Sequence, residues 1–123
     1  MGKFVINTTA TGFTFHLKAA NGQTIATSEV YTTEAACKKG IESVKVNAPV
    51  AALEDQTVEG FATEKHPKFE VYTDKKGEPR FRLTAKNGQT VAVSEGYASH
   101  DSALNGVESV RKNAPDAAVE EGK

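Results

Sequence analysis

Apolar and polar residues alternate along two stretches of the chain. Phe15 and Leu17 alternate with His16 and Lys18 in the first stretch, and residues 80–85 repeat the pattern with Phe81 and Leu83. A period of two is typical of a half-buried strand. An Asn-Gly pair follows each stretch, and both residue types tolerate positive φ angles. Each stretch therefore predicts a hairpin, preceded by a shorter strand at residues 4–6 or 69–72.

The turn of each hairpin can be chosen from the pairing of apolar residues. A two-residue turn would place Leu17 opposite Ala26, whereas a three-residue turn over residues 20–22 pairs Leu17 with Ile25. A slip of one residue moves every side chain to the other face of the sheet. We therefore predict the three-residue turn, with a bulge at the glycine, in both hairpins.

A helix is predicted after each hairpin. Apolar residues recur every three to four positions in residues 36–44 and 103–110. Thr32, Thr33 and Ser99 are candidate N-caps. Asn-Ala-Pro sequences at 47–49 and 113–115 end both helices, the Asn as a left-handed cap and the Pro because it cannot continue the helix.

One glycine interrupts each predicted helix. Gly40 and Gly106 occupy equivalent places, where glycine costs about 0.5–1 kcal/mol relative to alanine. We expect both to allow a close approach of the helix backbone to the sheet.

The chain contains an internal duplication. Residues 15–54 align without a gap on residues 81–120, and about half of the paired positions are identical. We divide the chain into a first repeat (1–54), a polar connector (55–67) and a second repeat (68–123), which together form one compact domain. Two copies are too few for an open solenoid and favour a closed, pseudo-twofold pair. We expect a monomer that resembles a dimer fused into one chain.

The repeated motifs resemble a known family. Both copies have an aromatic-x-Leu strand, an Asn-Gly turn, a Ser-Glu-x-Tyr segment and a Gly-Ile/Val-Glu-Ser-Val helix. This combination is similar to the YegP-like family, bacterial proteins with a domain of unknown function in single or tandem copies. The resemblance covers nearly the whole chain and implies an α+β fold. Two β-β-β-α-β units would share one antiparallel sheet, exchange their C-terminal strands, and place two helices on one face. It implies no activity, cofactor or catalytic residue.

Composition and charge narrow the class of protein. The chain has 123 residues, a formal net charge of −1 and a single cysteine, Cys37. That charge supplies no global attraction to nucleic acid or anionic membrane. No apolar run approaches the length of about 20 residues that spans a bilayer, and a lone cysteine suits a reducing compartment. We expect a cytoplasmic protein without a membrane partner.

The polar side of the predicted sheet carries the candidate binding residues. His16 and Lys18 in one copy, and Arg80 and Arg82 in the other, point away from the core side, with Tyr72 as a ring on the same side. Such a face can bind single-stranded nucleic acid, but the strand phenylalanines point inward and cannot stack on bases. A solvated face is the preferred interpretation, so nucleic-acid binding is kept as the alternative and not expected.

The Ser-Glu-x-Tyr segments are the second group of candidates. They comprise Ser28, Glu29 and Tyr31 in the first copy and Ser94, Glu95 and Tyr97 in the second. Functionally they look like two half-sites, but neither a His nor a Lys accompanies the serine in both copies, so a catalytic triad is not supported. The structural interpretation is preferred: the Glu satisfies N–H groups at the helix start and the Tyr anchors the loop.

Other reactive residues indicate no catalytic or metal site. His16, His66 and His100 do not recur between copies or show ligand spacing, and Cys37 lies on the apolar side of its helix. We therefore expect no metal or cofactor. The predicted function is a non-enzymatic binding or interaction module of unknown ligand. The alternatives are weak single-stranded nucleic-acid binding through the open sheet face, and an enzyme of unrecognised type.

Overall fold

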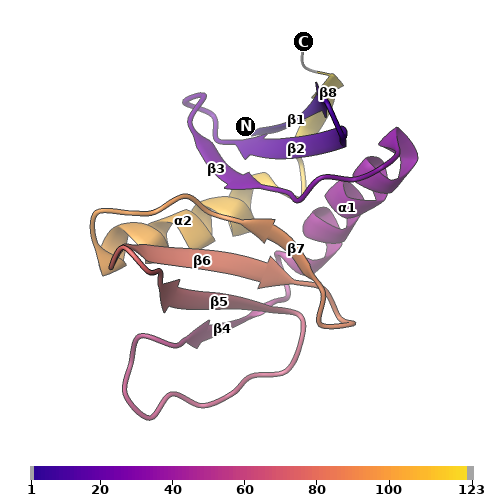
Figure 1. Ribbon diagram of the computed structural model, residues 1–123. Coiled ribbons are helices and arrows are strands. Elements are labelled where there is room, and N and C mark those ends of the chain that lie inside the picture. Colours follow the sequence, from indigo (N-terminus) through magenta and orange to yellow (C-terminus); the bar gives the residue numbers. More distant parts are fainter. Residues whose placement is uncertain (1, 122–123) are drawn as a thin grey trace.

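Strands and helices follow one another in the same order in both copies of the repeat. The computed structural model describes residues 2–121, and within them eight strands form one sheet against which two helices pack (Figure 1). The elements are β1 (Lys3–Thr9), β2 (Gly12–Lys18), β3 (Thr24–Thr27), α1 (Glu34–Asn47), β4 (Ala52–Asp55), β5 (Lys68–Thr73), β6 (Pro79–Thr84), β7 (Thr90–Val93), α2 (His100–Asn113) and β8 (Ala118–Glu121). No helix in this range is long and apolar enough to cross a bilayer.

The two copies exchange their last strands. The strand order is β4-β5-β6-β7-β3-β2-β1-β8, so β4 of the first copy borders β5 of the second, and β8 of the second borders β1 of the first. In the middle, β3 and β7 join the copies through the pair Thr27 and Val93, which are equivalent residues. The predicted α+β fold with pseudo-twofold symmetry and exchanged strands is confirmed.

The prediction of a wholly antiparallel sheet is wrong at both edges. The six central strands are antiparallel, but β4 runs parallel to β5 and β8 runs parallel to β1. Hairpins produce antiparallel neighbours, whereas parallel neighbours need a long connection. The twelve residues 56–67 join β4 to β5, and β8 and β1 lie near opposite ends of the chain, so neither parallel pair is joined by a hairpin.

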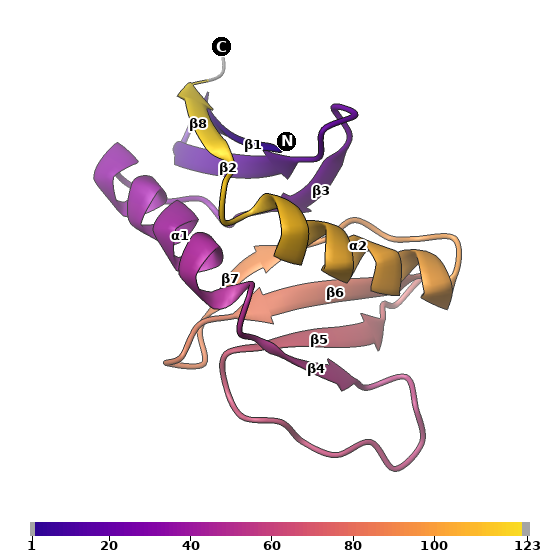
Figure 2. The same cartoon turned by 180° about the vertical axis from the view of Figure 1, so that it is seen from behind.

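Both helices cover the same face of the sheet (Figure 2). Helix α1 packs on β2 of its own copy and β7 of the other, while α2 packs on β5, β6 and β3. Four phenylalanines at most 1% exposed, Phe4, Phe15, Phe69 and Phe81, form the centre of the core on this side. Each helix therefore spans the junction between the copies.

The three-residue turn of each hairpin is confirmed. The Ala19 N–H donates to the Gln23 carbonyl oxygen (2.9 Å), and the Gly22 N–H donates to the Ala19 carbonyl oxygen (2.9 Å). Gly22 has a φ of 85°, in the left-handed region that favours glycine. The same two hydrogen bonds recur in the second hairpin, where Gly88 has a φ of 86°.

The predicted strand register beyond the turn is wrong. A second bulge between Leu17 and Lys18 places Leu17 opposite Ala26 instead of Ile25, and Leu83 opposite Ala92 instead of Val91. Successive strand residues normally point to opposite faces, but a bulge relaxes that rule. As a result Ile25 and Ala26 are both buried, at 7% and 2% exposed.

The helix caps are partly as predicted. Thr33 and Ser99 are the N-caps, each accepting a hydrogen bond (3.1 Å) from the backbone N–H three residues later. At the other end the predicted left-handed asparagine is wrong, since no residue other than glycine within 2–121 has a positive φ. Instead the Asn47 side-chain amide donates to the Ser43 carbonyl oxygen (2.7 Å), and Asn113 does the same to Ser109 (2.8 Å).

Candidate functional site

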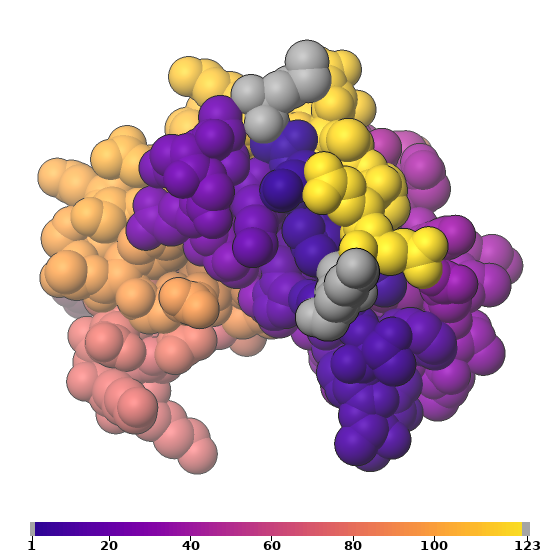
Figure 3. All heavy atoms as spheres, turned by 90° about the horizontal axis from the view of Figure 1, so that it is seen from above, coloured from indigo at the N-terminus to yellow at the C-terminus, as the bar shows by residue number. Residues whose placement is uncertain are grey.

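The predicted polar residues lie on the sheet face opposite the helices. Strand pairing places Arg82 beside Val93, Val93 beside Thr27, and Thr27 beside His16 in one row across the sheet. At about 4.8 Å per strand, His16 and Arg82 are therefore roughly 14 Å apart. Seen from above, this open face is hollowed between the β1–β2 turn (indigo) and the β5–β6 turn (salmon) (Figure 3).

Carboxylates neutralise both candidate arginines. The Arg80 Nε donates to Asp74 (2.5 Å) and its Nη1 to the Ser94 carbonyl oxygen (3.1 Å). Arg82 is paired with Glu70, and its guanidinium carbon lies 4.6 Å from the centre of the Tyr72 ring. The predicted basic face therefore carries alternating charges.

His16 and Lys18 lie in the other copy. The His16 Nδ1 is 3.0 Å from the Thr27 hydroxyl. Burial lowers the pKa of His16, and the nearby Lys18 charge lowers it further, against a smaller opposing influence of Glu95. His16 is therefore neutral at pH 7 and adds no positive charge to the open face.

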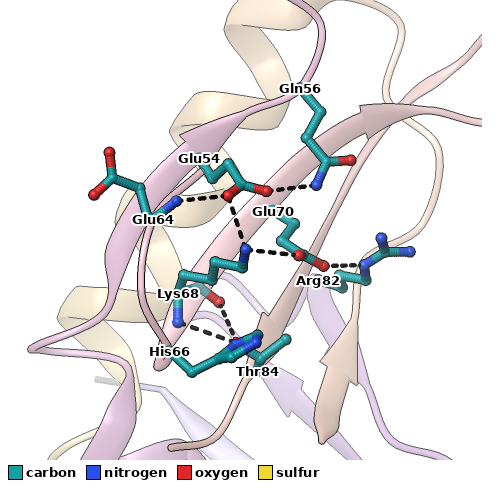
Figure 4. A network of polar contacts seen from close by, with 8 residues as sticks. All are labelled: Glu54, Gln56, Glu64, His66, Lys68, Glu70, Arg82 and Thr84. Atoms are coloured by element: carbon teal, nitrogen blue, oxygen red, sulfur yellow. Dashed lines mark hydrogen bonds and ion pairs between the residues drawn. The ribbon is translucent and has the colours of Figure 1, made fainter. Parts of the chain in front are cut away.

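A buried polar network, absent from the sequence predictions, occupies the second half of the open face (Figure 4). The Lys68 ammonium group lies 2.8 Å from a Glu54 oxygen and 3.3 Å from a Glu70 oxygen, with the Lys68 and Glu54 side chains 6% and 2% exposed. From the connector, the Glu64 backbone N–H donates to Glu54 (2.8 Å), and the Gln56 amide donates to the same carboxylate (2.6 Å).

This network holds the Glu54 carboxyl ionised. Burial alone would raise its pKa, but hydrogen bonds from Lys68, Gln56 and the Glu64 backbone, together with the Lys68 charge, outweigh burial and lower the pKa to about 2. The Lys68 pKa is raised, first by its hydrogen bond to Glu54. The network is an ion pair closed off by the connector and offers no open binding surface.

The serine of each Ser-Glu-x-Tyr segment has a structural role. The Ser28 hydroxyl accepts a hydrogen bond from the Phe15 N–H (2.9 Å) and donates to the Glu29 carbonyl oxygen (2.7 Å). Ser94 makes the same two contacts, with Phe81 and Glu95, at 2.9 Å each. Each serine continues the hairpin ladder where its strand ends.

The tyrosine of each segment explains the mid-helix glycine. Tyr31 stacks on Phe15, with ring centres 6.3 Å apart, and a Cβ on Gly40 would lie 2.3 Å from its hydroxyl oxygen. Tyr97 stacks on Phe81 at 6.0 Å, and a Cβ on Gly106 would meet its hydroxyl oxygen at the same 2.3 Å. The expected close approach is confirmed, with the tyrosine and phenylalanine rings as the neighbours.

The glutamate of each segment does not cap a helix, contrary to the prediction. Thr33 and Ser99 already fill that role, and the Glu29 and Glu95 residues are exposed. No side-chain hydrogen bond or ion pair of either glutamate occurs within residues 2–121. Instead each glutamate lines a cleft.

Two equivalent clefts lie at the junction of the copies. The α2 cleft, about 400 Å³, lies between α2 and the β2–β3 turn, and the α1 cleft, about 210 Å³, lies between α1 and the β6–β7 turn. The α2 cleft is lined by Ala19, Asn21, Gln23, Thr24, Ile25, Glu95, Gly96, Tyr97, Ser102, Asn105, Gly106 and Ser109. The α1 cleft is lined by Glu29, Tyr31, Ala36, Lys39, Gly40, Ser43, Ala85, Asn87, Gln89, Thr90 and Val91.

Every residue lining the α1 cleft has its counterpart, 66 positions away, in the α2 cleft. Eight of these eleven equivalent pairs are identical, against about half over the whole repeat. Each cleft combines the helix and tyrosine of one copy with the turn of the other. The sequence signal that could have pointed to them is the repetition of exposed polar residues such as Gln23 and Gln89.

The potential nucleophiles near the clefts are protonated. Burial raises the pKa of the Cys37 thiol, and burial likewise raises the pKa values of Tyr31 and Tyr97. Within residues 2–121, no three His, Cys, Asp or Glu side chains gather in a way that could hold a metal ion. The clefts offer carboxylate, hydroxyl and amide groups for hydrogen bonding.

The chain matches the family described as "Domain of unknown function (DUF1508)" twice, over residues 9–55 and 74–121. It is 39% identical to a UPF0339 protein of Bordetella pertussis over 116 residues, which cover 94% of this chain and 91% of that protein. A UPF0339 protein of Treponema denticola is 61% identical over 54 residues, which cover 44% of this chain but 93% of the relative. That relative therefore has essentially one copy of the repeat.

The fold is also similar to a solved structure. The NMR structure of yegP from E. coli, described as a protein of unknown function, superposes with a TM-score of 0.80 at 33% sequence identity. The match covers 98% of this chain and 92% of the E. coli protein. The tandem arrangement is thus present in a relative whose structure was determined by experiment.

Proposed function

Because this chain belongs to the DUF1508 family, we propose that it is a non-enzymatic binding module with two equivalent ligand sites, the α1 cleft and the α2 cleft. The ligand class is a small polar molecule, since the linings consist largely of amide, hydroxyl and carboxylate groups. The chain acts as a monomer, because each copy supplies the edge strand that the other copy needs.

The observation that carries this proposal is the identity of exposed cleft residues between the copies. Gln23 and Gln89 are exposed, as are Glu29 and Glu95, and exposed side chains generally contribute little to stability. Some other exposed positions have diverged, such as Val46 and its counterpart Lys112. Folding alone does not account for keeping the cleft residues identical, whereas a shared ligand does.

The protonation of the nearby groups supports binding over nucleophilic catalysis. A thiolate or phenolate nucleophile needs a lowered pKa. The pKa values of Cys37, Tyr31 and Tyr97 are raised, and the Cys37 side chain is fully buried. These groups therefore suit packing and hydrogen bonding.

Amide-shift mapping on the ¹⁵N-labelled full chain tests the proposal. A panel of small amines, carboxylates, sugars and a single-stranded oligonucleotide is titrated, and we expect at least one small molecule to shift amides of both clefts. The double variant Gln23→Ala/Gln89→Ala should lose these shifts. Lys112→Val, which installs the residue of the first copy at an exposed position, should keep them.

Two results would contradict the proposal. One is a panel in which every small molecule leaves the cleft amides unshifted. The other is an oligonucleotide that shifts only residues around Arg80 and Arg82, with an affinity that falls as salt is added. The latter would establish the nucleic-acid alternative on the open sheet face.

A further inference from the structure

The two clefts differ in charge at one pair of equivalent positions. Helix α1 presents Lys39 to its cleft, whereas α2 presents Asn105. The α1 cleft therefore contains one cation and one anion, Lys39 and Glu29. Glu95 is the one charged residue among those that line the α2 cleft.

The surroundings of the α2 cleft add negative charge. The Glu78 side chain packs against Gly96, where a Cβ would meet its Oε1 at 2.4 Å. In the first copy the residue equivalent to Gly96 is Val30. Glu95 affects the pKa values of two nearby groups, His16 and Tyr97. The pKa of His16 is lowered mainly by burial and that of Tyr97 is raised mainly by burial, so neither group supplies a positive charge to balance Glu95.

The α2 cleft, at about 400 Å³, lies within the range of small-molecule sites, and its polar side chains other than Glu95 are neutral. Asn21, Gln23 and Asn105 supply amides, and Thr24, Ser102 and Ser109 supply hydroxyls. A carboxylate without a protein cation attracts a charged donor, and such charge-assisted hydrogen bonds are stronger than neutral ones. The amides and hydroxyls match a ligand that also carries hydroxyl groups.

We propose that the α2 cleft binds a hydroxylated primary amine, with the ammonium group at Glu95, and that the α1 cleft binds the same ligand more weakly, because that cleft is smaller and because Lys39 repels the amine. This inference rests on the proposed function of the clefts and adds the charge class of the ligand. It also makes the two sites of one chain unequal.

Three sugars of matched size and different charge test the proposal on the full chain. Glucosamine carries an ammonium group, glucose is neutral and glucuronate is an anion. Cleft amides are followed by NMR titration at low salt. We expect glucosamine to shift α2-cleft amides at concentrations about tenfold lower than glucose, with glucuronate the weakest.

Exchange of the differing residues sharpens the test. Asn105→Lys should weaken glucosamine binding at the α2 cleft by about two- to fivefold, and Lys39→Asn should strengthen it at the α1 cleft by a similar factor. Both positions are exposed, and each variant installs the residue of the other copy. Glu95→Gln should remove the preference for glucosamine, and Glu59→Gln in the connector should leave it unchanged.

The possible failures are distinguishable. If all three sugars shift the α2 cleft equally, or glucuronate does so most strongly, the clefts bind ligands but the amine is wrong. If none of the three shifts the α2 cleft, the amine inference is overturned. The titration with amines, carboxylates, sugars and an oligonucleotide then tests separately whether the clefts bind any small molecule. If Glu95→Gln still prefers glucosamine over glucose, the Glu95 carboxylate does not bind the ammonium group.

Discussion

The same lysine–glutamate pair occurs in both halves of the sheet, exposed in one and buried in the other. In the first half Lys3 lies beside β8 and contacts Glu120 at 3.4 Å, with side chains 44% and 55% exposed. In the second half Lys68 lies beside β4 and contacts Glu54 at 2.8 Å, with side chains 6% and 2% exposed. Strand pairing is equivalent, since Lys3 opposes Ala118 and Lys68 opposes Ala52.

The connector causes the difference. Its residues return over the Glu54 carboxylate, whereas in the first half the equivalent pair is open to solvent. At the neighbouring position the second half also has an Asp55–His100 contact (2.6 Å), where the first half has Glu121 and Glu34. One repeat sequence thus yields a covered half and an open half, so equivalent residues have unequal energetic importance.

Separating the halves should have the largest effect, because it removes the exchanged strands. In a chain of residues 1–54, β4 has lost β5 and β1 has lost β8. A unit of this size has too small a core to be stable alone. We expect a homodimer in which each β4 pairs with the β1 of the other copy, as β4 pairs with β5 in the full chain. Analytical ultracentrifugation checks this expectation, and a folded monomer of 1–54 would contradict it.

Replacing the lysine of each pair should lower the free energy of unfolding by different amounts in the two halves. Lys68→Met leaves the buried Glu54 carboxylate without its cation and should destabilise the protein by about 3–5 kcal/mol. Lys3→Met removes an exposed pair and should cost at most about 1 kcal/mol. Urea denaturation followed by circular dichroism measures both.

A double variant controls for the loss of the lysine side chain itself. Lys68→Met with Glu54→Leu removes both charges and should recover much of the lost stability, because well-packed apolar residues can replace a buried ion pair. Equal losses of unfolding free energy in Lys68→Met and Lys3→Met would show that the connector does not shield the Lys68–Glu54 pair from solvent.

Leucine in place of the helix glycines tests a feature that the halves share. Gly40→Leu and Gly106→Leu should each destabilise by about 1–3 kcal/mol through overpacking against the tyrosine and phenylalanine rings. Gly106→Leu should be the more damaging, since a Cβ there lies 2.8 Å from a Phe81 carbon, against 3.1 Å from Phe15 at Gly40. Lys38→Leu, which copies residue 104, is the matched control. An unchanged melting temperature for both glycine variants would refute the packing argument.

The local parts of this architecture could be predicted from the sequence. Turns, N-caps and the close approach at Gly40 depend on a few neighbouring residues, whose conformational preferences are strong. The bulge beside Leu17 could not be predicted, because it buries both Ile25 and Ala26 in a strand that packs against α2, a helix distant in the sequence. The parallel edges likewise depend on where each chain segment returns.

The candidate site was only partly visible in the sequence. Glu29 and Tyr31 stood out by repetition, but their cleft needs the β6–β7 turn of the other copy, including Gln89. No local sequence pattern predicts which turn packs opposite which helix. Conversely, the sequence alone indicates a free cation at Arg82. Its partner Glu70 lies on the neighbouring strand, twelve residues away in the sequence, so the ion pair is visible only in the structure.

Acid should reveal the buried pair through the pH dependence of the protein's stability. The pKa of Glu54 is about 2 in the folded protein and near the ordinary value of 4.5 when unfolded. The unfolded state therefore binds the proton more readily, so this stabilisation is complete above about pH 4.5 and is lost as the pH falls towards 2.

Urea denaturation at several pH values between 5 and 2 measures this loss. Lys3→Met should lose stability with the same pH dependence as the unmodified protein, since its pair is exposed. In Lys68→Met the pKa of Glu54 should rise, because burial then acts without its main opposing hydrogen bond, and the acid-dependent loss through Glu54 between pH 4.5 and 2 should shrink or reverse. Identical pH curves for Lys68→Met and the unmodified protein would show that Lys68 does not hold Glu54 ionised.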